Sequence, residues 1–125
     1  MIKVDFNKQN EKIITITGKS NSFRTNVKDI THIVCDEYVS TVHLINGTKY
    51  DVTRLLKCFE ESFKDDTFFK VARNTLINTE QVGIRIVHKE RSIDINGIII
   101  KASRRRFALL KKKFLYGELS FCDER

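Results

Sequence analysis

The chain of 125 residues contains no proline and only five glycines. Flexible linkers are usually rich in these residue types, and no repeat or low-complexity tract is visible, so the sequence predicts one domain. A chain of this length has no room for a second domain of about a hundred residues. We expect the domain at residues 12–116, after a short polar lead at residues 1–11 and before a tail at residues 117–125.

Cysteines and long apolar runs are scarce as well. Cys35, Cys58 and Cys122 are far apart, and no CxxC pair occurs. This spacing excludes the usual zinc and redox-dithiol motifs and favours isolated buried thiols in a reducing cytosol. No run of about 18 apolar residues exists, and the N-terminus lacks an apolar signal segment. We therefore expect a cytoplasmic protein with no membrane partner.

The motifs of common enzymes are missing too. His32, His43 and His88 are scattered, and no HExxH, GxSxG, P-loop or glycine-rich dinucleotide motif occurs. Asp36-Glu37 and Asp65-Asp66 leave one enzymatic alternative, a nuclease with a carboxylate-bound metal ion. Adjacent acidic residues in loops are usually only solvated, so we expect no catalytic residue, no metal site and no cofactor.

Short segments rich in β-branched residues predict strands over most of the chain. Asn46-Gly47 lies between two of them and is typical of a type I′ hairpin turn, in which both residues have a positive φ. A second Asn-Gly turn is predicted at residues 96–97, and residues 73–78 are ambiguous. The predicted strands are residues 12–17, 22–27, 30–35, 38–45, 48–52, 67–72, 82–88 and 92–102.

Two segments change to a helical period. The first, residues 53–63, has a mildly acidic outer face and is a poor candidate to lie against phosphate. The second, residues 104–115, has Ser103 as its predicted N-cap. These helices and the strands together predict a mostly β fold, α+β by content. The predicted inner positions are Leu55, Leu56, Phe59 and Phe63 in the first helix and Phe107, Leu110 and Phe114 in the second.

The positive charge is confined to the second part of the chain. The net charge is +7, yet residues 1–69 contain 10 basic and 10 acidic residues, whereas residues 70–125 contain 13 basic and 6 acidic ones. Such a distribution attracts polyanions, with nucleic acid first and an anionic membrane surface second. A lysine-rich, merely solvated surface is the alternative.

The densest basic run is at residues 101–113, which contain seven basic residues and no acidic one. Three consecutive arginines, residues 104–106, open the predicted helix. The helix dipole is positive at that end, so each of these cations costs about 0.3–1 kcal/mol unless an anion binds there. Arginine also presents a planar fork of donors that fits phosphate or the major-groove edge of guanine. A solvated amphipathic helix is the alternative.

A second basic cluster, Lys70, Arg73 and Asn74, follows the predicted strand at residues 67–72. Arginine and asparagine are side chains that read base edges. Asn74 could equally close a turn through its own backbone. Asn78, a polar residue at the end of an apolar run, is predicted to be structural.

Two segments carry a family resemblance. FKVARNTLIN at residues 69–78 resembles the signature of LytTR-type DNA-binding domains, found in bacterial transcription regulators. IIIKASRR at residues 98–105 resembles the second signature of that family, a strand that leads into Ser-Arg-Arg at a helix start. VKDITHI at residues 27–33, followed by Tyr38-Val39 and an Asn-Gly hairpin, matches the upstream pattern. The resemblance covers roughly residues 12–115.

The resemblance implies an elongated, antiparallel β fold whose loops, rather than a helix, enter the major groove. It implies a transcription regulator that binds double-stranded DNA as a dimer on a repeated site, with an unidentified signalling partner. The positions that match the base-reading residues of the family are Tyr38, Arg73 and Arg105. Contacts to the DNA backbone are expected from Lys70, Asn74, Lys101, Ser103, Arg104, Arg106 and Lys111.

RNA binding and generic polyanion binding are alternatives that the charge alone does not separate from DNA binding. Proteins that read single strands need exposed aromatic side chains on which bases stack. Most of the nine phenylalanines fall on apolar stripes and are predicted to be core, which disfavours the RNA alternative.

Overall fold

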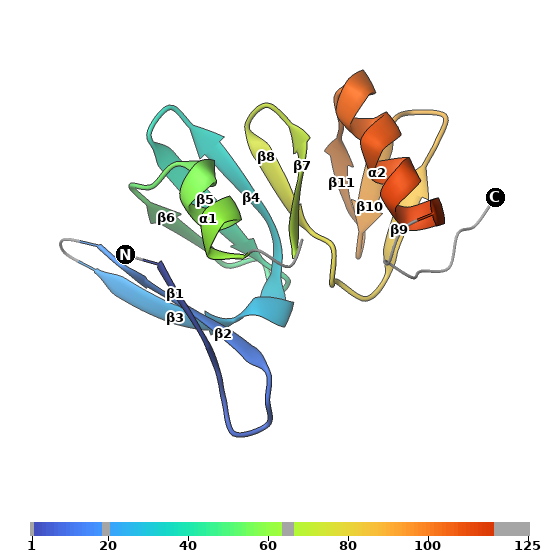
Figure 1. The fold of residues 1–125 in the computed structure, drawn as a ribbon. Coiled ribbons are helices and arrows are strands. Elements are labelled where there is room, and N and C mark those ends of the chain that lie inside the picture. The colour runs from blue at the N-terminus through green and yellow to red at the C-terminus, as the bar shows by residue number, and fades with distance from the viewer. Residues whose placement is uncertain (1, 19–20, 64–66, 117–125) are drawn as a thin grey trace.

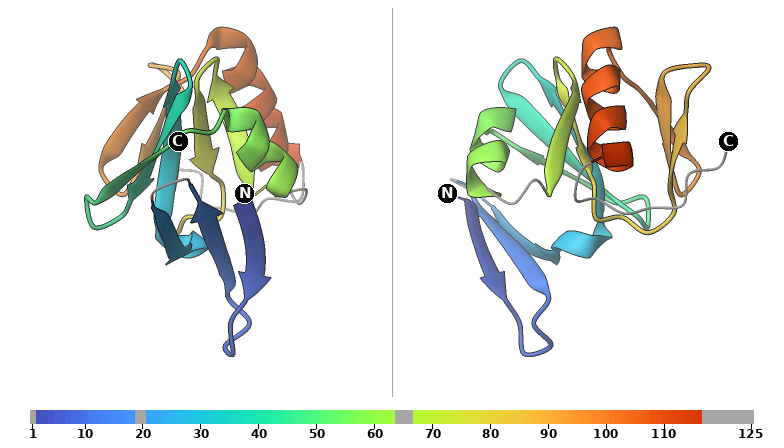
Figure 2. Two further views of the ribbon diagram at one scale, coloured as in Figure 1. Left: turned by 90° about the vertical axis from the view of Figure 1, so that its left-hand side faces the viewer. Right: turned by 45° about the vertical axis from the view of Figure 1, so that its right-hand side comes forward.

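The computed structural model describes residues 2–18, 21–63 and 67–116. Three sheets follow one another across the molecule, with helix α1 (Leu56–Ser62) over the second sheet and helix α2 (Arg104–Tyr116) packed against both the edge of the second sheet and the third sheet (Figures 1 and 2). The predicted mostly β fold with open antiparallel sheets and two helices is therefore confirmed. No helix in the described part of the chain combines the length and apolar character needed to cross a membrane.

Every strand pairing in the three sheets is antiparallel. Sheet A has the order β1-β2-β3 and comprises Ile2–Phe6, Lys12–Thr17 and Ser22–Asn26. A 3-10 turn, η1 (Val27–Asp29), leads from β3 into sheet B. Sheet B has the order β6-β5-β4-β8-β7; in chain order its strands are β4 (Ile30–Asp36), β5 (Val39–Leu44), β6 (Lys49–Val52), β7 (Phe68–Ala72) and β8 (Thr75–Asn78). Sheet C has the order β11-β10-β9; in chain order its strands are β9 (Ile84–Val87), β10 (Ser92–Ile95) and β11 (Ile98–Lys101).

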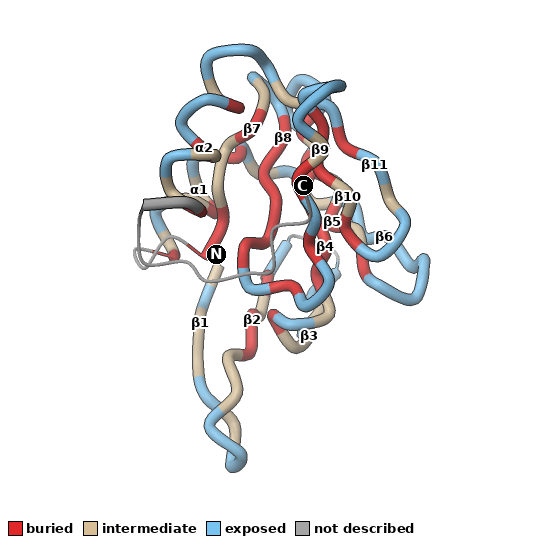
Figure 3. The backbone as a smooth tube through the Cα atoms, turned by 90° about the vertical axis from the view of Figure 1, so that its right-hand side faces the viewer, coloured by how far each residue is buried: buried red, intermediate tan, exposed pale blue. Residues whose placement is uncertain are grey.

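Strand β8 lies between two hydrophobic cores. All of its residues are buried, and Figure 3 shows it as an unbroken buried segment. Leu76 packs with Phe59 of α1 in one core, and Ile77 packs with Leu110 of α2 in the other. Because neither face of the strand is solvated, its sequence does not alternate between apolar and polar residues, which explains the ambiguity of residues 73–78.

The inner faces of the helices match the sequence pattern with one exception. Helix α1 begins at Leu56 rather than at residue 53, because Leu55 has an extended backbone (φ −81°, ψ 159°). The Leu55 side chain is 47% exposed, so its predicted place on the inner face is wrong. The inner positions that are confirmed are Leu56, Phe59, Phe63, Phe107, Leu110 and Phe114.

Residues 1–11, predicted as a polar lead, contain strand β1. This strand pairs with β2 along its whole length, from Ile2 opposite Ile16 to Phe6 opposite Lys12. Ile2 and the other inward residue of β1, Val4, pack against the core that α1 covers. The segment resembles a polar lead because only these two aliphatic side chains face inward, between charged neighbours.

The two Asn-Gly pairs form different turns. At residues 46–47 only Gly47 has a positive φ (91°), and the Asn46 side chain accepts a hydrogen bond from the Thr48 amide (2.9 Å), so the predicted type I′ turn is wrong. At residues 96–97 both Asn96 (φ 51°) and Gly97 (φ 93°) have the positive φ values that this turn type requires.

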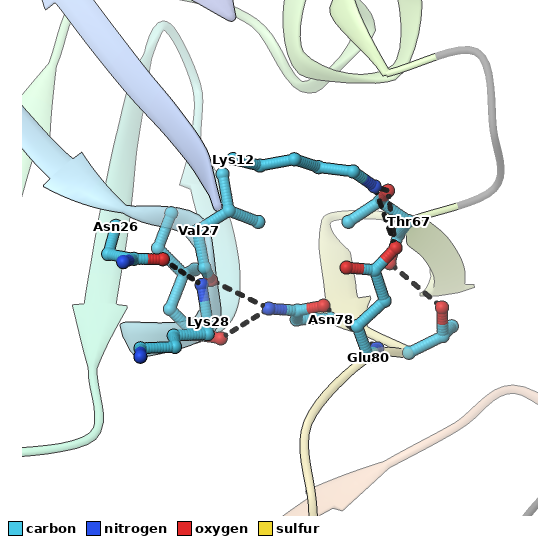
Figure 4. Close-up of polar contacts among 9 residues, drawn as sticks. Lys12, Asn26, Val27, Lys28, Thr67, Asn78 and Glu80 are labelled. Atoms are coloured by element: carbon cyan, nitrogen blue, oxygen red, sulfur yellow. Dashed lines mark hydrogen bonds and ion pairs between the residues drawn. The ribbon is translucent and has the colours of Figure 1, made fainter. Parts of the chain in front are cut away.

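Asn78 ties the end of β8 to the beginning of sheet B. Its Nδ2 donates hydrogen bonds to the carbonyl oxygens of Val27 (2.9 Å) and Ile30 (2.8 Å), and its Oδ1 accepts one from the Glu80 amide (2.9 Å) (Figure 4). Lys12 of β2 reaches the Glu80 carboxylate at 2.7 Å, which connects sheet A to the same point. The structural role predicted for Asn78 is confirmed.

A stacked histidine pair joins β4 to β5. The rings of His32 and His43 lie 4.2 Å apart between centroids, at an interplanar angle of 7°, and the Thr31 hydroxyl is 2.8 Å from His32 Nδ1. Burial, followed by the charge of His43, lowers the pKa of His32 from 6.5 to about 4. Burial also lowers the pKa of His43.

Replacing Asn78 by alanine should lower the free energy of unfolding by about 1–3 kcal/mol, because the carbonyl oxygens of Val27 and Ile30 each lose one donor and the Glu80 amide loses its acceptor. Urea denaturation at pH 7.5, followed by circular dichroism, measures the effect. Asn46→Ala is the matched control, since the Asn46 side chain is exposed and its substitution should change stability little. Equal losses in the two variants would contradict the role assigned to Asn78.

The histidine pair predicts acid sensitivity in a defined pH window. A folded-state pKa below the unfolded value means that the unfolded chain binds more protons, so the stabilisation is complete above pH 6.5 and is lost as the pH falls toward about 4. The loss for His32 should amount to about 2–3 kcal/mol. His32→Phe should flatten this part of the curve of unfolding free energy against pH. An unchanged curve would show that His32 does not cause the acid sensitivity.

Candidate nucleic-acid interface

Four connecting segments lie at one end of the strands, at the top of Figure 1. They follow from the antiparallel order, in which alternate connections return to the same end of a sheet. We call them the loop edge: the β4–β5 turn (residues 37–38), the β7–β8 turn (residues 73–74), the β9–β10 turn (residues 88–91) and the β11–α2 junction (residues 102–105). The right panel of Figure 2 shows the same alignment from another direction.

Backbone hydrogen bonds connect the segments of the loop edge to one another. One bond links the end of β4 to the β7–β8 turn, a second links the end of β7 to the β11–α2 junction, and a third links that junction to the β9–β10 turn. They run from Cys35 N–H to Asn74 O, from Ser103 N–H to Val71 O and from Ala102 N–H to Arg91 O, each at 2.9 Å. The relative positions of the segments therefore depend on main-chain groups.

Tyr38 lies at the tip of a tight turn. Asp36 pairs with Val39, which leaves only Glu37 and Tyr38 in the connection. Glu37 has a left-handed backbone (φ 58°), and its carbonyl accepts a hydrogen bond from the Cys35 thiol (3.3 Å). Tyr38 is 72% exposed, so its ring and hydroxyl are available to a ligand.

Arg73 and Asn74 form the tip of the next turn, and both are exposed. The register of β7 and β8 shifts between Lys70 and Ala72, so a bulge precedes the turn. Asn74 Oδ1 accepts a hydrogen bond from the Thr75 hydroxyl (3.1 Å), which is a contact between side chains and not the turn closure through the backbone that the sequence left open. Lys70 is half-buried on β7.

The β11–α2 junction supplies the largest group of cations. Ser103 is confirmed as the N-cap, because its hydroxyl accepts a hydrogen bond from the Arg106 amide (3.4 Å). Arg104 and Arg105 are exposed in the first turn of the helix, together with Lys101 at the end of β11, whereas Arg106 is half-buried. Free helical N–H groups and several guanidinium groups thus occupy the same place.

Lys111 is the predicted contact that lies farthest from this junction. It follows Arg104 by about two helical turns, or about 10 Å along the axis. Its ammonium lies 5.4 Å from the centroid of the Phe107 ring, and its side chain is half-buried. The structure therefore brings the other predicted contacts together at or beside the loop edge and leaves Lys111 below it.

Within the described ranges, none of the predicted contact cations forms an ion pair with a carboxylate. The acidic residues of α1 are elsewhere: Glu61 pairs with Lys57 (3.9 Å) on a helix that covers a face of sheet B. The loop edge therefore has a large uncompensated positive charge. Its acidic side chains are Glu37 at the β4–β5 tip and Glu90 in the β9–β10 turn.

The β9–β10 turn was not singled out from the sequence. It places exposed His88, Lys89 and Arg91 at the loop edge, and the His88 ring meets the Phe107 ring edge-on at 6.2 Å. Only the strand order could have predicted its position, because this turn returns to the same end of the sheets as the β4–β5 and β7–β8 turns. Charged residues in a turn carry no signal by themselves, since most turns are polar.

The residues weighed for a metal site form no cluster within the part of the chain that the structure describes. Among the described residues, no group of three or more His, Cys, Asp or Glu side chains could hold a metal ion. Cys35 is buried and Cys58 is half-buried. Cys122 and the pair Asp65-Asp66 lie outside the described residues.

Comparisons with known proteins agree with this geometry. The profile of the LytTr DNA-binding domain family matches residues 20–115. Among solved structures, the fold is similar to the LytTr DNA-binding domain of a methyl-accepting/DNA response regulator from Bacillus cereus, with a TM-score of 0.60 and 14% identity over 81% of this chain and 94% of that one. No curated protein sequence matches the chain. The family profile covers most of the chain, including all four segments of the loop edge, and on this ground the chain belongs to the LytTR family of DNA-binding domains.

Proposed function

We propose that the chain binds double-stranded DNA sequence-specifically and regulates transcription by inserting its loop edge into the major groove. The observation that carries this proposal is the hydrogen-bonded alignment of the four loop-edge segments, whose exposed cations have no carboxylate partner among the described residues. Phosphate is the anion that such a row of cations would meet at regular intervals on a duplex.

Three side chains act as base readers in this proposal. Arg73 and Arg105 each offer a planar fork that fits O6 and N7 of guanine. Tyr38 offers one hydroxyl and a ring that can rest on a thymine methyl group or a sugar. These residues belong to three different segments of the loop edge, so they would contact separate base pairs.

The remaining polar residues hold the DNA backbone. Phosphate contacts fix the register of a protein on the duplex without reading its sequence. The proposed contacts are Lys70, Asn74, Lys101, Ser103, Arg104, Arg106 and Lys111, and the β9–β10 turn adds Lys89 and Arg91. Lys111 would contact DNA only where the duplex continues past the helix start.

A duplex is favoured over single-stranded RNA by the aromatic residues. Single-strand binding uses exposed rings on which successive bases stack. Of the tyrosines and phenylalanines in the described ranges, only Tyr38 is exposed on the loop edge, whereas Phe6 and Tyr50 are exposed on β1 and β6.

The wider proposal includes two copies on a repeated site, a cytoplasmic location and a signalling partner. Selection of bound duplexes from a random pool tests both the specificity and the repeat.

The salt dependence of binding measures the electrostatic part of this proposal. With about six phosphate contacts, the logarithm of the association constant should fall against the logarithm of salt concentration with a slope of about −5. Fluorescence anisotropy of one labelled duplex between 50 and about 300 mM salt gives the slope. A slope near zero would contradict the basic interface, and equal binding to heparin and duplex would indicate a generic polyanion binder.

Addition of a chelator tests the nuclease alternative, because cleavage that stops on chelation would support it.

Loss of a base-reading residue should lower affinity for the selected site alone, whereas loss of a phosphate-contacting residue should lower affinity for every duplex. Arg73→Ala and Arg105→Ala should each weaken the selected site by about 1–3 kcal/mol with little effect on non-specific duplex, because bidentate base contacts carry discrimination. Lys101→Ala should weaken all duplexes about equally, because it removes a proposed phosphate contact, and Tyr38→Phe should cost less than Arg73→Ala.

Titration of each variant against one selected and one scrambled duplex, at fixed salt, measures these differences. Glu60→Ala is the control, because Glu60 is half-buried on α1 away from the loop edge, and charges beyond a Debye length of about 8–10 Å are screened. A change of sequence preference in Glu60→Ala but not in Arg73→Ala would place α1, rather than the loop edge, against the DNA.

A further inference from the structure

Glu37 is an unexplained acidic residue at the tip of a basic interface. Its side chain is exposed, and in the described part of the chain its carboxylate takes part in no ion pair or hydrogen bond. It shares the β4–β5 tip with Tyr38, which the proposed function assigns to base reading. An acidic residue in this place opposes non-specific attraction to phosphate, which makes Glu37 a candidate for a favourable contact with another group on the DNA.

The geometry of the turn keeps Glu37 at the interface. The pair Asp36–Val39 leaves two residues in the connection, so Glu37 and Tyr38 form the tip together. The Cys35 thiol holds the Glu37 carbonyl at 3.3 Å, and the Cys35 amide holds the neighbouring turn through Asn74 O at 2.9 Å. Glu37 therefore lies beside the turn that carries Arg73, and the two turns would enter the DNA together.

The major groove offers few groups that a carboxylate can contact favourably. Phosphate and the acceptor atoms of guanine and thymine repel it, and the amino groups of cytosine (N4) and adenine (N6) are the donors there. Adenine places its N7 acceptor next to that donor, whereas a cytosine amino group suits an acceptor-only side chain such as glutamate.

We propose that Glu37 is a specificity-determining residue that accepts a hydrogen bond from the N4 amino group of a cytosine next to the guanine read by Arg73. This inference rests on the proposed function, because it requires the loop edge to lie in the major groove. In it the β4–β5 tip reads two features at once: Tyr38 contacts a thymine methyl group or a sugar, and Glu37 selects a cytosine. The same carboxylate weakens binding to duplexes without that cytosine, which is specificity by repulsion as well as by attraction.

The test is duplex selection from a random pool by the wild-type chain and three variants. Glu37→Gln keeps the shape of the side chain and exchanges the acceptor-only group for one that pairs with adenine N6 and N7. Glu37→Gly suits the left-handed backbone (φ 58°), so it removes the side chain without straining the turn. Asp36→Asn is the matched control, because it removes one negative charge from the adjacent paired residue.

The wild-type site should contain a required cytosine that Glu37→Gln changes to adenine. Glu37→Gly should lose about tenfold in discrimination at that position. Asp36→Asn should keep the cytosine and bind all duplexes somewhat more tightly. The inference is overturned if both Glu37 variants keep the wild-type preference and gain affinity uniformly, as the Asp36 variant does, because Glu37 then acts only as a charge. A wild-type chain that selects no site would overturn the proposed function, and this inference with it.

Discussion

The burial of β8 on both faces is the constraint on which the rest of the structure depends. Leu76 and Ile77 point into different cores, so this strand is shared by the part of the molecule that α1 covers and the part that α2 covers. Asn78 fixes the end of the strand against η1 and β4 through buried hydrogen bonds. The other end of β8 continues into the turn with Arg73, so the packing of both cores also determines where that turn lies.

The fold could be predicted from the sequence wherever one face of an element is solvated. Alternating strands and the amphipathic helix α2 were recognised because their period reports a buried and an exposed side. The period fails for β8, which has no exposed side, and for β1, which has too few inward residues. Turn geometry was predicted least well, because Asn46 and Asn96 have the same following residue but different backbone conformations set by their surroundings.

The candidate site was predicted from residue type and from family resemblance, and both signals are local. They identified the arginines at the helix start and the turn at residues 73–74, but they say nothing about which turns share an edge. That information comes from strand order, so the β9–β10 turn and the position of Glu37 beside the turn of Arg73 became visible only in the structure. Lys111 is the opposite case. Its charge suggested a contact with DNA, but the residue lies on α2 about two helical turns from the loop edge, and its ammonium lies over the Phe107 ring.

The hydrogen bonds that hold the loop edge together use backbone groups, so they do not depend on which side chains the loop edge carries. A substitution at Tyr38, Arg73 or Arg105 alters what the edge presents but removes none of the bonds that align its segments. Under the proposed function, mutation at these positions would change the DNA sequence that is read at little cost in folding, while the buried residues beneath stay fixed. With that function, a scaffold of this kind would allow paralogues to acquire distinct target sites while they keep one architecture.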